Sequence, residues 1–72
     1  MQIYKNLGGN SSVRTFSIGT DYIDVQFSSG TPYRYSYKSA GIEKVEQMKK
    51  LAISGRGLGS YINRYAKYDY EK

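Results

Sequence analysis

The chain has 72 residues, enough for one domain with a single small core, because chains near this size bury only about 60% of their unfolded surface. It contains no cysteine and no histidine, which excludes disulfide bonds and thiolate metal sites and leaves only six Asp and Glu as metal ligands. Eleven Lys and Arg give a formal net charge of +5, which attracts anionic partners. No apolar run approaches the roughly 20 residues that span a bilayer. We therefore expect a cytoplasmic protein that needs no cofactor and does not bind a membrane.

The N-terminal residues are set apart from the rest of the chain. Residues Gln2–Asn6 are predicted to form an edge strand or a loose arm, because the Gly8–Ser12 segment that follows is a flexible break with strong turn-forming residues. We therefore expect residues 1–11 to form this strand or arm and residues 12–72 to form the domain itself.

Two alternating segments follow and predict strands. Arg14–Ile18 places Phe16 and Ile18 on one face and stops at a turn that begins with Gly19. The next strand is the clearest, because its apolar residues alternate with polar ones; they are Ile23, Val25 and Phe27. The connections are too short for a crossover helix, so the sequence predicts an antiparallel meander.

Three tyrosines at alternate positions mark the following strand. Residues two apart in a strand share a face, so Tyr33, Tyr35 and Tyr37 form one row of rings while Arg34 and Lys38 lie on the other side. The row is either part of the core or a platform on which a base or sugar stacks. Periodicity favours inward packing with the hydroxyls at the rim, because this strand must also supply a core face.

The apolar period then changes to about 3.6, which predicts helices. Ser39 is the expected N-cap of the first helix, and Gly55 its expected end. Its apolar stripe consists of Ile42, Val45, Met48 and Ala52. A second helix, Ser60–Lys67, is expected to pack three residues inward, namely Tyr61, Ile62 and Tyr65. Helices this short are not stable alone in water, so both must pack against the apolar face of the meander. The predicted fold class is therefore α+β, an antiparallel meander of three to four strands followed by two helices packed on one face.

Positive charge is concentrated in the second half of the chain. Residues 1–37 hold three cations and two acids, a net charge of +1, whereas residues 38–72 hold eight cations and four acids, a net charge of +4. Between Lys49 and Lys67 there are five cations and no acid. This segment is either an anion-binding surface or a solvated helix face with ordinary lysines.

The glycine-rich connection Ser54–Ser60 leads into the second helix. Unpaired backbone N–H groups at a helix start attract phosphate or carboxylate, and Arg56 and Arg64 could add bidentate contacts. The segment lacks the lysine and spacing of a P-loop. The alternative is that its three glycines only allow a sharp turn between helices.

The residue types that carry most acid–base and nucleophilic catalysis are missing. There is no histidine or cysteine to activate a serine, and Asp21 and Asp24 are expected in a turn and on an exposed strand face. We therefore predict that the chain is not an enzyme.

The order of several short motifs resembles the KTSC domain. Ile18–Asp21, Ile23–Phe27 and Tyr33–Tyr35 are similar to its first half, which has a central Tyr-x-Tyr, and Gly59–Asn63 followed by Tyr68 is similar to its second half. Val13 and Gly30 also match, and the resemblance covers residues 12 to 68.

KTSC domains occur as small bacterial and phage proteins and at the C-terminus of some lysyl-tRNA synthetases. The resemblance implies RNA binding. The positions concerned are Tyr33, Tyr35, Gly59, Tyr61 and Asn63. Two departures imply a different partner: a longer glycine-rich connection, and Ile62 where the family usually has an aromatic residue.

The leading hypothesis is a small non-catalytic module that binds RNA or another nucleic acid through a basic surface that bears tyrosines. The residues expected to contact phosphate are Arg34, Lys49, Lys50, Arg56, Arg64 and Lys67. Those expected to stack on bases or to hydrogen-bond them are Tyr33, Tyr35, Tyr37, Tyr61 and Asn63. The alternative is a phage- or bacteria-encoded inhibitor that binds a protein or sequesters a nucleotide as a homo-oligomer. A third reading is a structural or assembly protein whose basic charge maintains solubility.

Overall fold

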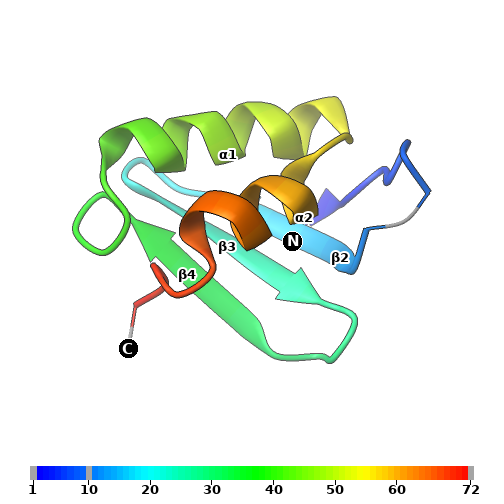
Figure 1. Cartoon of the computed structure of the whole chain (residues 1–72), viewed down its shortest axis with the longest axis horizontal. Helices are drawn as coiled ribbons and strands as arrows, with labels where there is room; N and C mark the ends of the chain where they lie inside the picture. The colour runs from blue at the N-terminus through cyan, green and yellow to red at the C-terminus, as the bar shows by residue number, and fades with distance from the viewer. Residues whose placement is uncertain (1, 10, 72) are drawn as a thin grey trace.

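The computed structural model describes residues 2–9 and 11–71, which form an antiparallel sheet with helices on one face (Figure 1). The four strands lie in chain order and each neighbouring pair is antiparallel. Their bounds are Gln2–Ile3 for β1, Val13–Ile18 for β2, Tyr22–Phe27 for β3 and Pro32–Ser36 for β4. The predicted α+β class and meander are confirmed.

The helical part contains a long helix and a shorter one that changes its winding. Helix α1 spans Ile42–Ser54, and α2 spans Leu58–Tyr61 and continues directly into the π-helical turn η1, Ile62–Ala66. The expected end of α1 is confirmed, because Gly55 is left-handed with φ 79° and its N–H donates to the Leu51 carbonyl. No described helix has the length and apolar content needed to cross a bilayer.

Ser39 is not the N-cap of α1, so that prediction was wrong. The cap position is Gly41, whose φ of 94° favours glycine, and no side chain caps the helix. Ser39 instead belongs to the turn after β4, where its hydroxyl accepts a hydrogen bond from the Ser36 N–H at 3.0 Å. A local turn thus uses the side chain that the pattern assigned to the helix.

A single core lies between the sheet and the helices. Its centre is formed by side chains of β3 and α1 with no exposed surface, among them Ile23, Val25, Val45 and Met48. The short helix contributes Leu58, Ile62 and Ala66, which are four residues apart and therefore share one face. Strand β4 contributes Tyr35, which is 2% exposed.

Three side chains expected in the core are exposed. Ile42 is the first residue of α1 and lies before the part of the helix that covers the sheet; it is 60% exposed. Tyr65 points away from the face formed by Ile62 and Ala66 and is 56% exposed. Ile18 ends β2 and is 36% exposed, whereas a register shift near the start of that strand lets both Val13 and Phe16 point inward.

The N-terminal segment belongs to this core. β1 is the edge strand that the sequence allowed, and the next residue, Tyr4, is only 4% exposed. Its hydroxyl accepts a hydrogen bond from the Leu58 N–H at 3.2 Å, at the start of α2. The segment is therefore not a loose arm. Met1, Asn10 and Lys72 lie outside the described residues. The predictions for residues 1–11, for residues 12–72 and for the Gly8–Ser12 break therefore each include a position that the structure does not describe.

Candidate functional site

The tyrosine row divides between the core and its rim. Tyr35 packs inward as predicted, and its burial raises the pKa of its hydroxyl to about 12. Tyr33 is half-buried, with its ring centroid 5.8 Å from that of Phe27 and 4.7 Å from that of Tyr70. Tyr37 lies beyond the end of β4, and its hydroxyl donates to Glu46 at 2.6 Å. The three rings therefore do not form one continuous platform.

An open groove of about 370 Å³ lies between β4 and the short helix, and we call it the aromatic groove. Four rings from the sheet and the C-terminal end of the chain dominate its walls: Phe27, Tyr33, Tyr35 and Tyr70. Tyr68 also lines it and is 67% exposed, so its ring faces solvent beside the groove. The remaining lining residues are Ser12, Ser28, Ser29, Ile62, Asn63 and Lys67, of which only the lysine is charged. This combination suits a flat apolar ring that carries an anionic group.

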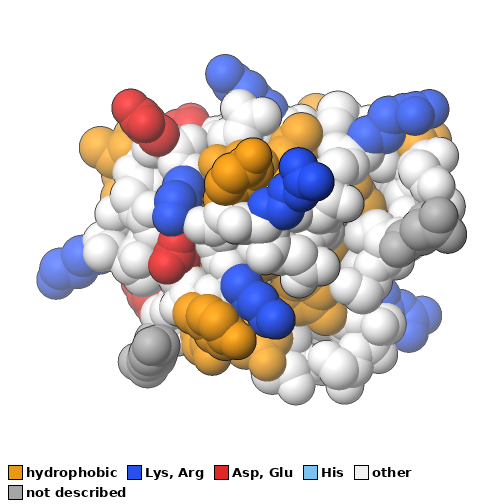
Figure 2. Space-filling view, viewed as in Figure 1, with side chains coloured by type: hydrophobic (Ala, Val, Ile, Leu, Met, Phe, Trp, Pro, Cys, Tyr) orange, Lys and Arg blue, Asp and Glu red, His pale blue; other side chains and the backbone are white. Residues whose placement is uncertain are grey.

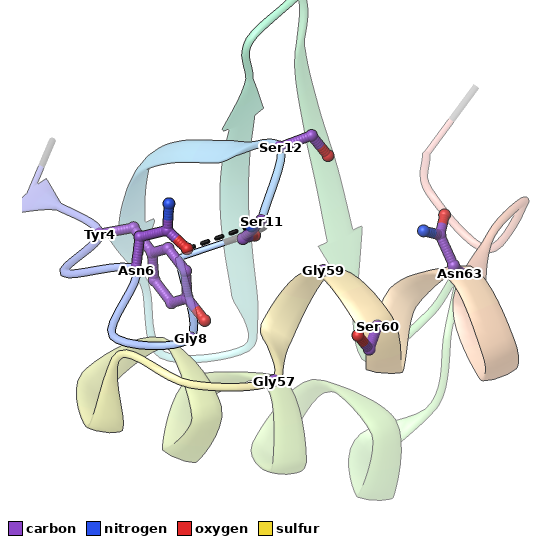
Figure 3. Close-up of a pocket in the computed structure, with 9 residues that line it drawn as sticks. All are labelled: Tyr4, Asn6, Gly8, Ser11, Ser12, Gly57, Gly59, Ser60 and Asn63. Carbon is purple, nitrogen blue, oxygen red and sulfur yellow. Dashed lines mark hydrogen bonds between the residues drawn. The ribbon is translucent and has the colours of Figure 1, made fainter.

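A second hollow, of about 340 Å³, adjoins the groove, and we call it the polar pocket. Ser12 and Asn63 line both hollows, so the two adjoin at these residues. Figure 3 shows these two side chains on separate segments, Ser12 just before β2 and Asn63 in η1. The other lining residues are Tyr4, Asn6, Gly8, Ser11, Gly57, Gly59 and Ser60, and none of them is charged.

The wall of the polar pocket is held by short-range hydrogen bonds. The Ser11 N–H donates to Asn6 Oδ1 at 3.1 Å, and the Ser11 hydroxyl accepts from the Val13 N–H at 3.1 Å (Figure 3). Gly59 is buried against this wall, and a Cβ at that position would lie 2.8 Å from Ser11 Oγ. A Cβ at this position would require the Ser11 hydroxyl, which accepts the bond from the Val13 N–H, to move.

Three predicted cations are exposed, and one of them lines a hollow. Lys67 lines the aromatic groove and lies 5.6 Å from the Tyr68 ring centroid. Arg64 belongs to η1 and is exposed, and Arg56 is exposed in the glycine-rich connection beside Gly57, which lines the polar pocket. Figure 2 shows Lys and Arg side chains among hydrophobic ones on the face that carries the helices.

Two other predicted cations are engaged within the protein. The Lys49 ammonium lies 2.7 Å from Glu46 and 3.0 Å from the Thr20 carbonyl, and only 12% of its side chain is exposed. Its hydrogen bond with Glu46 raises the pKa of Lys49. Arg34 lies on the opposite face of the sheet, where it makes a bidentate contact with Asp24 at 2.7 and 3.0 Å and covers the Tyr22 ring. That hydrogen bond raises the pKa of Arg34.

The structure thus brings together four of the predicted site residues, namely Tyr33, Tyr35, Asn63 and Lys67. Lys50 is exposed on α1, outside both hollows, and Tyr61 is half-buried beside Tyr65 with the ring centroids 5.0 Å apart. The sequence reasoning missed Tyr68 and Tyr70. Their alternate spacing repeats the Tyr-x-Tyr pattern of β4 and was the available indication.

No family model matches the chain, and the comparisons with curated proteins and with solved structures found no match either. The resemblance to the KTSC domain therefore stays a prediction. Within residues 2–9 and 11–71, no three side chains of the acidic, Cys or His type gather into a group that could hold a metal ion.

Proposed function

We propose that this protein is a non-catalytic module that binds unpaired segments of RNA. The observation that carries the proposal is the aromatic groove, which places tyrosine rings, the Asn63 amide and the Lys67 ammonium around one hollow. Stacking of a base on an aromatic side chain contributes about 1–3 kcal/mol and does not require a particular base. A base in a duplex has its faces covered by its neighbours, so the groove suits an unpaired nucleotide.

The charges around the groove fit a phosphate backbone. Lys67 lies in the groove as the C-cap of η1, and Arg64 lies three residues earlier in η1. No carboxylate of the described residues lines either the groove or the polar pocket. The net charge of +5 adds a long-range attraction for polyanions. Binding through these cations should therefore weaken as salt concentration rises.

The side chains around both hollows support binding without catalysis. They are aromatic rings, amides, hydroxyls and one ammonium, and the chain contains no histidine or cysteine. A serine hydroxyl needs an adjacent base to act as a nucleophile. Ser12 and Ser60, which line the polar pocket, make no hydrogen bond to such a group within the described residues.

The test is fluorescence anisotropy with a labelled single-stranded RNA of about ten nucleotides. We expect Tyr68→Ala to weaken binding about tenfold through lost stacking, and Tyr65→Ala, which removes an exposed ring outside the groove, to change it less than twofold. Lys67→Ala should reduce the slope of log affinity against log salt by about one, because one phosphate contact is lost.

Lys5→Ala is the matched control for the lysine, since Lys5 is exposed and lines neither hollow. Absence of binding at low salt would overturn the proposal. Equal losses for Tyr68→Ala and Tyr65→Ala would show that the groove is not where the RNA binds.

A further inference from the structure

The polar pocket has the chemistry of a site for an uncharged, hydroxyl-bearing group. Its side-chain donors and acceptors are serine hydroxyls, asparagine amides and the Tyr4 hydroxyl. Within the described residues, the side chains of Ser12, Ser60 and Asn63 make no hydrogen bond to the protein, so they are free to bind a ligand. No cation of the described residues lines this pocket, and the Leu58 N–H at the start of α2 already donates to the Tyr4 hydroxyl, so little here offsets the cost of desolvating a phosphate. A sugar needs only neutral partners.

The position of the pocket relates it to the aromatic groove. Ser12 and Asn63 line both hollows, so the two adjoin at these residues. In a nucleotide the ribose is bonded directly to the base. A base held in the groove beside Ser12 and Asn63 places its ribose within reach of the polar pocket when the glycosidic bond faces the shared boundary.

The pocket is also formed before any ligand binds. Its wall is fixed by the hydrogen bonds of Asn6 with Ser11 and of Ser11 with Val13, and by the close approach of Gly59 to Ser11. On the other side, the Tyr4 hydroxyl joins the wall to the start of α2. A preformed wall does not have to be ordered on binding, which lowers the entropic cost. The volume of about 340 Å³ exceeds the minimum of small-ligand sites, about 300 Å³.

From these observations we infer that the polar pocket binds the ribose of the nucleotide whose base lies in the aromatic groove. The inference rests on the proposed function and deepens it, because the 2′-hydroxyl is the group that distinguishes RNA from DNA. A deoxyribose in the pocket loses one neutral hydrogen bond. We expect about fivefold weaker binding of DNA than of RNA with the same bases.

The experiment compares labelled oligouridine with labelled oligodeoxyuridine of equal length, so that only the 2′-hydroxyl differs. Ser60→Ala removes a hydroxyl that lines only the polar pocket, and Asn63→Ala removes the amide at the boundary. Both residues are exposed, so the fold should survive, which circular dichroism checks. Each variant should lose about fivefold in affinity for the ribose form and bring the ratio of the two affinities toward one. Gln47→Ala, an exposed amide on α1 outside both hollows, is the control and should leave the ratio unchanged.

The outcomes separate this inference from the proposed function. Equal binding of the two oligomers at every salt concentration overturns the ribose inference and leaves the RNA-binding module standing. Binding of neither oligomer overturns both. A ribose preference that neither Ser60→Ala nor Asn63→Ala reduces overturns the assignment to the polar pocket. Uridine 5′-monophosphate and its deoxy form, added as competitors, should show the same preference if single nucleotides enter the site as well.

Discussion

Glu46 is held by two donors on the surface of α1. Its carboxylate lies 2.7 Å from the Lys49 ammonium and accepts a hydrogen bond from the Tyr37 hydroxyl at 2.6 Å. The bond to Lys49, followed by the bond to Tyr37, lowers the pKa of Glu46. The carboxylate therefore favours folding at pH values above its unfolded pKa of about 4.3, and this contribution is lost as the pH falls through the lower pKa of the folded state.

Replacing Lys49 with Ala should raise the pKa of Glu46 toward its ordinary value, because the largest cause of the shift is removed. Titration of the glutamate side-chain carbons by NMR measures this directly. Lys50→Ala is the control, since Lys50 is exposed and acts on Glu46 only through a smaller charge effect. Equal shifts in the two variants would contradict the hydrogen-bonded geometry. The same ion pair engages the Lys49 ammonium within the protein.

Residues 67–71, the C-terminal tail, fold back over the edge of β4 and complete one wall of the aromatic groove. The Glu71 N–H donates to the Arg34 carbonyl at 2.6 Å, and Asp69 pairs with Lys44 of α1 at 2.6 Å. Between these anchors, the Tyr70 ring lies against Tyr33 and Tyr35, with centroids 4.7 and 6.3 Å apart. The tail thus covers an edge that would otherwise present unpaired backbone groups.

We expect Tyr70→Ala to lower the free energy of unfolding by about 2 kcal/mol, because half-buried apolar surface and two ring contacts are lost. Urea denaturation measures the change. Tyr68→Ala removes the same side chain from a position that is 67% exposed and should cost less than about 0.5 kcal/mol. Similar losses in both variants would mean that the tail does not pack as described.

The elements were predictable where the pattern is local and repeated. The alternation along Tyr22–Phe27 correctly predicted a strand, and Gly55 correctly predicted the end of a helix. Both features depend on only a few neighbouring residues. The inward face of the short helix was wrongly predicted, because the expected helix began at Ser60 and left out Leu58. Leu58, Ile62 and Ala66 form the buried stripe, and Tyr65 lies off it and is exposed.

The candidate site was predictable only in part, since its two hollows join segments far apart in sequence. The tyrosines of β4, Asn63 and Lys67 were singled out by residue type and spacing. The contribution of Ser12 and of the tail depends on tertiary contacts, as does the pairing of Arg34 with Asp24 on the opposite face. Local sequence patterns carry no information on such contacts. For this reason Ser12 and the tail tyrosines were not predicted as groove residues, and the ion pairs of Arg34 and Lys49 were not foreseen.

At the scale of the whole molecule, the core is closed by a contact between the N-terminal segment and the start of α2. Tyr4 lies among core residues that extend to Ala66, and its hydroxyl accepts from the Leu58 N–H, 54 residues away. One core in a chain this small should unfold in a single transition. Substitutions in the segment before β2 are therefore expected to change the free energy of unfolding of the whole domain, and not only the local order of that segment.

Tyr4→Phe should lower the free energy of unfolding by about 1–2 kcal/mol, because the buried Leu58 N–H loses its partner while the ring remains. Tyr4→Ala should cost about 3–5 kcal/mol, enough to unfold much of a marginally stable domain. Ile3→Ala, at a neighbouring side chain that is 79% exposed, is the control and should change stability by less than about 0.5 kcal/mol. Urea denaturation followed by circular dichroism and by tyrosine fluorescence should give coincident transitions for Tyr4→Phe. If Tyr4→Phe behaves like Ile3→Ala, the hydroxyl does not hold α2, and the preformed wall of the polar pocket loses one of its supports.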